Sequence, residues 1–207
     1  MRDSSRQKRA YNKNKLETIL VKTGFQRLFM YGNKSLAKTI WEDGKNAASF
    51  KHIIASGTAS LYAKFLAAEV LRYFEVKLDP QNHSVLAEIY ANALKNTSAD
   101  RENSVRLNGN LWGFLYETND AGYLGQQFIR FGDAAIPPLT KLLEDSAGRI
   151  LYEGSKEATM GNAYQYRIKD FATFYISKIK DIPITFYRDL KERDKEIEKL
   201  RIFLKKH

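Results

Sequence analysis

Residues 131–145 read FGDAAIPPLTKLLED, and this stretch decides how the chain is expected to fold. Gly132 predicts a tight turn, and Asp133 has the side chain of a helix N-cap. Pro137 and Pro138 then fall in the first helical turn, where backbone N–H groups have no acceptor within the helix, so two prolines cost little. The stretch therefore predicts a short helix that begins abruptly and folds back on the helix before it. Its apolar stripe comprises Ile136, Leu139, Leu142 and Leu143.

Apolar residues recur at helical spacing along most of the chain. Residues 58–76 (TASLYAKFLAAEVLRYFEV) are the most apolar, which predicts a helix enclosed by its neighbours with one narrow wet stripe. The charged members of that stripe are Lys64, Glu69, Arg72 and Glu75. Further helices are expected at about 15–31 (where Gly24 could break the helix), 35–42, 47–55 and 84–96, with two short ones over 111–132. A charged C-terminal helix would cap the array with Leu190, Ile197, Leu200 and Leu204 on its apolar face.

The stretch from Gly132 to Asp145 resembles the second helix of a HEAT repeat. In that family the next first helix carries a basic residue, an alanine three positions on and an aliphatic residue seven positions on. Residues 64–71 (KFLAAEVL) and 169–176 (KDFATFYI) fit this pattern. The resemblance implies an all-α fold of stacked antiparallel helix pairs, a HEAT-like α-solenoid, whose extended surface mostly holds partners. The alternative fold class is an irregular helical bundle without a repeat.

Residues 1–14 are polar and basic, so they are expected to form a disordered arm ahead of a single all-helical, repeat-like domain over 15–207. Residues 1–15 contain six Lys and Arg against one Asp, which is about half of the formal net charge of +10. The body of the protein is therefore not expected to be uniformly basic. If the arm binds nucleic acid, the phosphate contacts would come from Arg6, Lys8, Arg9, Lys13 and Lys15.

Few residues in the chain have the chemistry of a catalytic or metal site. There is no cysteine, which excludes disulfides, thiolate catalysis and Cys-based metal sites. The three histidines lack the spacing of metal ligands, and the loop at 153–162 lacks the phosphate-binding GxxxxGK[ST] pattern, so no metal or cofactor is expected. No segment is apolar enough for a membrane span, and no secretory signal is visible, so a cytoplasmic protein is expected, or an exported one if the numbering begins after a removed signal.

The link after Asp145 is about 20 residues long (SAGRILYEGSKEATMGNAYQ), whereas the HEAT family uses a few. Loops this long are uncommon in compact arrays and are often functional. Its apolar residues argue against full disorder, and Ser155 and Gly161-Asn162 would begin and end a turn of helix. The main hypothesis is a non-enzymatic scaffold that binds a protein or peptide. The expected contacts are Trp112, Tyr116, Arg149, Tyr152, Glu153 and Lys156.

Three alternatives stay open. Trp112 and Tyr116 are four residues apart and share one helix face, for which core packing is the usual explanation. The chain could instead be a nucleic-acid-binding helical-repeat protein that uses the basic arm. It could also be a HEAT-like DNA glycosylase, with Glu117 or Asp120 as the acidic residue, but that hypothesis rests on fold-level resemblance alone. No catalytic residue is predicted.

Overall fold

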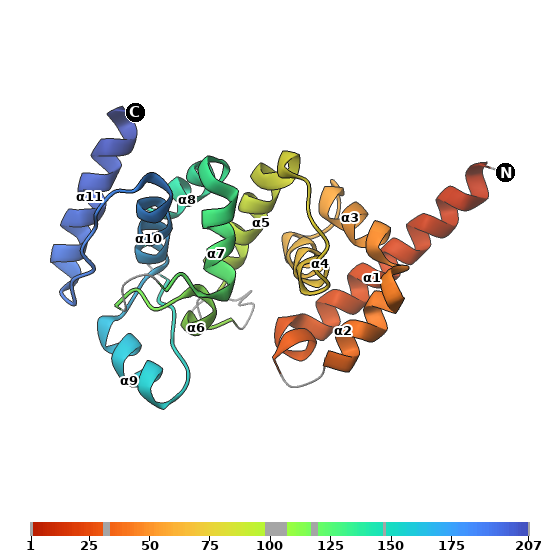
Figure 1. Ribbon diagram of the computed structural model, residues 1–207, viewed down its shortest axis with the longest axis horizontal. Helices are drawn as coiled ribbons and strands as arrows, with labels where there is room; N and C mark the ends of the chain where they lie inside the picture. The colour runs from red at the N-terminus through yellow and green to blue at the C-terminus, as the bar shows by residue number, and fades with distance from the viewer. Residues whose placement is uncertain (1, 31–33, 98–106, 117–119, 147, 207) are drawn as a thin grey trace. The chain divides into compact units, whose positions relative to one another are not determined.

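A computed structural model describes residues 2–30, 34–97, 107–116, 120–146 and 148–206 (Figure 1). The α-helices and 3₁₀ helices (η) are α1 (Arg2–Phe29), α2 (Lys34–Trp41), η1 (Glu42–Gly44), α3 (Ala47–Ala55), α4 (Leu61–Tyr73), η2 (Pro80–Asn82), α5 (His83–Lys95), α6 (Gly109–Trp112), α7 (Gly122–Phe131), η3 (Gly132–Ala135), α8 (Ile136–Leu142), α9 (Ser155–Tyr164), α10 (Ile168–Lys180) and α11 (Leu190–Lys206). Within the described ranges β-structure is limited to two isolated bridges, Phe114 with Asp120 and Arg149 with Arg167. The predicted all-α class with packed helix pairs is confirmed.

The chain forms two compact units, residues 1–82 and residues 83–207. The boundary falls between η2 and α5. This division differs from the single domain expected over 15–207. The first helix begins at Arg2, ahead of the start expected at Lys15. Disorder of residues 1–14 in solution stays a prediction.

Helix α4 is the core of the first unit and packs against α1 and α3. The Ser60 hydroxyl caps its N-terminus by accepting a hydrogen bond from the backbone N–H of Ala63 (3.1 Å). The predicted enclosure is confirmed, since every side chain from Phe65 to Leu71 is buried. The wet stripe is narrower than expected, because Glu69 is fully buried. Its two carboxylate oxygens accept hydrogen bonds from Arg72 at 3.1 and 2.6 Å, which compensates for the buried charge.

Gly24 interrupts α1 with φ 71° and ψ 165°, so the break that the sequence suggests at this residue is present. This backbone conformation suits glycine because it has no Cβ. The interruption is tied to α4, because the backbone N–H of Phe25 donates a hydrogen bond to the Tyr62 hydroxyl (3.1 Å). Burial raises the pKa of the Tyr62 hydroxyl, and its bond with Phe25 opposes that shift.

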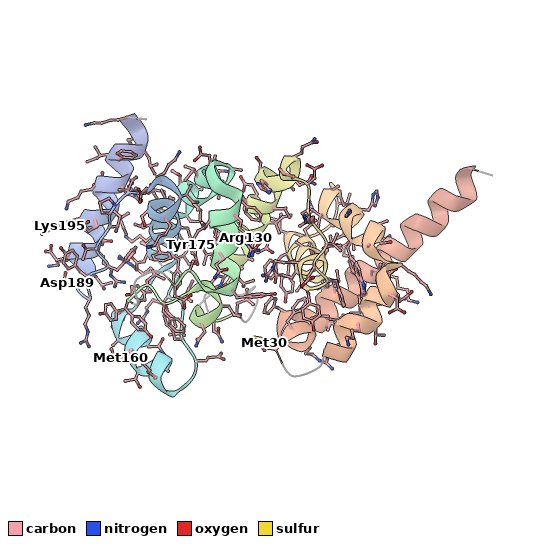
Figure 2. The ribbon with its side chains drawn as sticks, viewed as in Figure 1. Met30, Arg130, Met160, Tyr175, Asp189 and Lys195 are labelled. Carbon is pink, nitrogen blue, oxygen red and sulfur yellow. The ribbon has the colours of Figure 1, made fainter. Side chains whose placement is uncertain are left out.

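Helix α10 is the centre of the second unit and packs against α7, α8 and α11. Its residues 170–177 are all buried. The hydroxyl of Tyr175 donates a hydrogen bond to the backbone carbonyl of Trp112, which joins α10 to the end of α6 (Figure 2). Gly125 of α7 faces the Tyr175 ring so closely that a Cβ there would overlap it. Tyr175 therefore requires a glycine on the neighbouring helix.

The stretch that begins with FGDAA folds as η3 followed by α8. Pro137 and Pro138 lie at the first helical positions of α8, as predicted. The predicted cap is wrong, because Asp133 lies in η3 and accepts a hydrogen bond from Lys180 (2.8 Å), and no side chain caps α8. The main neighbours of α8 are α10 and α5. The proline-started helix therefore packs on helices distant in sequence, and the prediction that it folds back on the helix before it is wrong, because α7 is not among its main neighbours.

Helix α11 contacts α10 with the predicted face, but not with every residue predicted on it. Ile197 and Leu200 are buried as expected, but Leu190 is 38% exposed. Arg193, three residues after Leu190, is buried in this stripe instead (1% exposed). A charged residue can occupy this position because a buried carboxylate lies opposite it, as described below.

Candidate functional site

The long link of the second unit is an ordered insertion, defined here as residues 148–165. Its extended part, 148–153, runs beside the start of α10: the N–H of Ile150 donates to the carbonyl of Tyr166 (3.0 Å), and the N–H of Ile168 donates to the carbonyl of Gly148 (2.9 Å). On its other edge, the N–H of Gly109 donates to the carbonyl of Leu151 (2.8 Å). Backbone hydrogen bonds on both edges therefore hold this segment in place.

Two asparagine side chains complete the hydrogen bonding of the insertion. Asn162 of α9 accepts from the N–H of Tyr152 (2.8 Å) and donates to the carbonyl of the same residue (3.1 Å). Asn110 of α6 makes the same reciprocal pair with Glu153, at 2.9 and 3.0 Å. The Glu153 carboxylate also accepts from the Asn108 amide at 3.0 Å. Each amide thus satisfies both polar groups of one extended residue, as a β-strand partner would.

The buried side chain of Tyr152 attaches the insertion to the core of the second unit. Its ring is 2% exposed and stacks on Phe114 with centroids 5.4 Å apart. Its hydroxyl donates a hydrogen bond to the carbonyl of Gly113 (2.7 Å). Gly109 and Gly161 both face this ring, and a Cβ at either position would overlap it. Burial raises the pKa of the Tyr152 hydroxyl well above its usual range.

Three tyrosine rings and a guanidinium form a continuous stack beside Tyr152. Tyr116 stacks on Tyr164 at 5.6 Å, and Tyr164 stacks on Tyr166 at 5.1 Å. The guanidinium of Arg193 lies 4.8 Å from the centroid of the Tyr166 ring. Tyr166 is fully buried, whereas Tyr116 and Tyr164 are half-buried. The stack therefore leads from the interior to the surface at the end of α9.

Asp170 is the centre of a buried ionic cluster that joins α10 to α11. Its carboxylate is 2.9 Å from Arg167 and 3.1 Å from Arg193. Asp194 of α11 pairs with both Arg167 and Lys169 at 2.8 Å. Partial burial would raise the pKa of Asp194, but the hydrogen bonds from Arg167 and Lys169 outweigh burial and lower it. Arg193 has its pKa lowered by burial, which the charge of Asp170 opposes.

The outer side of the insertion presents apolar side chains to solvent. Leu151 is 53% exposed and Met160 is 46% exposed. Met160 shares one exposed face of α9 with Lys156 and Ala163, because these positions are separated by three or four residues. Figure 2 shows Met160 on α9, at the edge of the second unit.

The structure divides the six predicted contact residues into two groups. Trp112 and Tyr152 are buried, and the indole N–H of Trp112 donates to the Thr97 hydroxyl at 2.9 Å. These two residues form the core beneath the insertion, so any effect they have on binding is indirect. Tyr116 is half-buried and contacts Tyr152 through its ring (6.2 Å). The exposed members are Arg149, Glu153 and Lys156.

Sequence reasoning missed several residues of this site. α9 begins at Ser155 as predicted, but it continues through Gly161 and Asn162 to Tyr164, so the predicted helix end is wrong. The Asn162 side chain therefore binds backbone instead of ending a helix. The N–H of Arg167 donates a hydrogen bond to the Asp170 carboxylate (2.8 Å). The two residues are three positions apart, which is the spacing of a capping box, so this pair had a signal in the sequence.

The alternative site residues are placed only in part. The side chains of Arg6, Lys8, Arg9 and Lys13 lie outside the described residues, and Lys15 is exposed on α1. Glu117 also lies outside them, and Asp120 accepts a hydrogen bond from the N–H of Gly122 (2.8 Å). In the described part of the chain, His, Asp and Glu side chains form no cluster suited to a metal ion. Within the same ranges, no helix has the length and apolarity needed to cross a membrane.

Comparisons with known proteins place no family on this chain. No protein-family model, no curated protein and no solved structure matches it.

Proposed function

We propose that this protein is a non-enzymatic helical scaffold that binds a protein or peptide through the outer side of the insertion. The observation that carries the proposal is the exposure of Leu151 (53%), in the extended part whose backbone is hydrogen-bonded on both edges, and of Met160 (46%) on α9. Single exposed apolar residues are ordinary on protein surfaces. Both side chains lie on hydrogen-bonded backbone, so we expect a partner that covers them to lose little conformational entropy.

The charged residues of the insertion supply the polar rim that such a contact needs. Arg149, Glu153 and Lys156 are exposed on the same insertion as the two apolar side chains. Protein interfaces typically surround an apolar centre with polar and charged groups. Charges of both signs occur in this rim, which favours a protein surface over a polyanion as the partner.

We further propose that the helices belong to a HEAT-like stack. The support is the resemblance of residues 131–145 together with two features of α8: the abrupt start after Gly132 (φ 58°) and the prolines in its first turn. The two other matching stretches lie in α4 and α10, the most enclosed helices of their units. A first helix with neighbours on several sides is what a stack of helix pairs requires.

A photo-cross-linking competition tests the binding proposal. A photoreactive amino acid is placed at position 160, and in a matched control at position 123, since Tyr123 is similarly exposed (43%) on α7. Unlabelled wild type and a Leu151→Asp, Met160→Asp double variant are the competitors. We expect a discrete adduct at position 160 that wild type suppresses at least tenfold better than the variant. Equal suppression by the two competitors, or identical adducts at positions 160 and 123, would contradict the proposal.

One observation favours a second function, nucleic-acid binding by the first unit. Residues 1–82 contain 15 Lys and Arg against 7 Asp and Glu, whereas residues 83–207 contain 19 against 17. The positive charge is therefore concentrated in one unit and extends beyond the arm. Lys15 and Lys22 are exposed on α1, and Lys51 is exposed on α3. Such a concentration of cations attracts phosphate backbones.

Salt dependence tests this second function. Fluorescence anisotropy with labelled 20-mer single-stranded and duplex probes would show affinity that falls steeply between 50 and 200 mM salt, roughly tenfold or more. Removal of residues 2–15 should lower both the affinity and the salt slope. Binding that is absent at low salt, or unchanged by the deletion, would contradict a role for these residues.

A further inference from the structure

A shallow pocket lies beside the insertion, between the end of α9 and the start of α11. Its volume is about 740 Å³, and it is open to solvent. Its walls include Tyr164 and Gln165 on one side, and Arg188, Asp189, Leu190 and Lys191 on the other. Figure 2 shows Asp189 and Met160 toward the same end of the second unit. A partner lying on α9 could therefore reach this pocket.

The charges of the pocket are arranged unevenly. Arg188 and Lys191 are exposed, and neither has an ion-pair partner among the residues that the structure describes. Asp189 is engaged, because one carboxylate oxygen accepts from the backbone N–H groups of Lys191 (2.8 Å) and Glu192 (3.0 Å) at the start of α11. A ligand in the pocket therefore meets two cations without ion-pair partners in the described part of the chain and one carboxylate that is hydrogen-bonded to backbone N–H groups.

The aromatic wall of the pocket is packed between two other rings. The Tyr164 ring is held between Tyr116 and Tyr166, at centroid distances of 5.6 and 5.1 Å. Beneath it, Arg193 donates a hydrogen bond to the backbone carbonyl of Tyr164. Across the pocket, Leu190 is 38% exposed. A fixed aromatic ring opposite an exposed aliphatic side chain offers apolar contact at little entropic cost.

We propose that this pocket takes an acidic segment of the partner peptide, with one carboxylate between Arg188 and Lys191 and an adjacent large apolar side chain between Tyr164 and Leu190. This rests on the proposed function, because α9 and the pocket would hold the same peptide. A nucleic-acid strand fits less well, because two cations can pair with one carboxylate but cannot compensate a continuous row of phosphates next to Asp189 and Glu192. A small free anion fits less well too, because exposed cations in an open pocket hold such ions weakly.

Selection from a displayed library of random dodecapeptides tests this inference on the full chain. Peptides are selected on wild type, and their affinities are then measured on an Arg188→Glu, Lys191→Glu variant. The matched control is Lys205→Glu, Lys206→Glu, which makes the same charge change on exposed residues of α11. Melting curves confirm that each variant is folded. We expect enriched peptides in which Asp or Glu neighbours an aromatic or large aliphatic residue.

The variants separate failure of this inference from failure of the proposed function. We expect at least tenfold weaker binding to the pocket variant, unchanged binding to the control, and weaker binding to the Leu151→Asp, Met160→Asp variant. Enriched peptides that lack acidic residues, or that bind the pocket variant as tightly as wild type, would overturn the inference. They would not contradict binding through Leu151 and Met160. Peptides that need Arg188 and Lys191 but ignore the Leu151 and Met160 changes would support the pocket and contradict the proposed function. A library that yields no binder would contradict both.

Discussion

Arg193 of α11 and Asp170 of α10 form an ion pair of 3.1 Å in which the two side chains are 1% and 0% exposed. This pair explains how a helix with few apolar residues stays attached to the second unit. The Arg193 side chain also lies over the Tyr166 ring and donates to the Tyr164 carbonyl. One residue of α11 thus supports both α10 and the end of α9, so the insertion and the C-terminal helix depend on each other.

Replacing Arg193 with Met should destabilise the second unit by about 3 kcal/mol, because it leaves the Asp170 charge buried with one partner fewer. The control Lys195→Met changes a side chain that is 67% exposed and should leave the free energy of unfolding nearly unchanged. Urea unfolding followed by circular dichroism measures both. Equal losses in the two variants would show that the buried pair does not secure α11.

The pH dependence of stability should report on Asp194. Its pKa is lowered from the usual 3.8 by Arg167 and Lys169, so its contribution is present above pH 3.8 and is lost as the pH falls through the lowered value. Because the side chain is 46% exposed, the contribution is about 0.5–1 kcal/mol. The unfolding free energies of wild type and Asp194→Asn should therefore differ at pH 7, and the difference should shrink as the pH falls below 3.8. A difference that is unchanged at pH 2 would contradict the pairing.

Gly161→Ala should destabilise the insertion by about 2 kcal/mol, because the new methyl group would overlap the Tyr152 ring. Alanine normally stabilises a helix relative to glycine by about 1 kcal/mol, so a loss here isolates the steric effect. Gly57→Ala is the control, since a Cβ there has no neighbour within 4 Å. Thermal unfolding that leaves Gly161→Ala as stable as wild type would mean that α9 does not pack on Tyr152.

Tyr62→Phe should destabilise the first unit by about 1–2 kcal/mol, because the N–H of Phe25 loses its acceptor beside the break at Gly24. Tyr187→Phe serves as the control, since Tyr187 is 44% exposed. Urea unfolding of both variants provides the comparison. If the two losses were equal, the hydroxyl of Tyr62 would have no part in holding the break.

The helices were largely predictable because their signals are local. Helical spacing of apolar residues located α4, the resemblance of residues 169–176 to a HEAT first helix pointed to α10, and Pro137-Pro138 located the start of α8. The errors came from partners distant in sequence. Asp133 was predicted to be a helix cap, but its carboxylate binds Lys180. Leu190 was predicted to be buried, but Arg193 is buried instead because it pairs with Asp170. Sequence spacing cannot supply those pairings.

The site was predictable as a segment but not as a set of contacts. The unusual length of the link pointed to residues 148–165, and Tyr152 was singled out with its neighbours. Its burial depends on Gly109 and Gly161, which lie 52 residues apart in the sequence and meet at one ring. Asn110 and Asn162 were missed because an asparagine that binds extended backbone has no spacing signal of its own.

The proposal depends most on the insertion being a rigid surface, and amide hydrogen exchange resolved to single residues tests this directly. The N–H groups of Ile150 and Tyr152 are hydrogen-bonded to Tyr166 and Asn162, so they should exchange about 100-fold or more slower than in an unstructured peptide. Protection of that size at both positions would support a preformed docking surface. Exchange of both amides at the unstructured rate would contradict it.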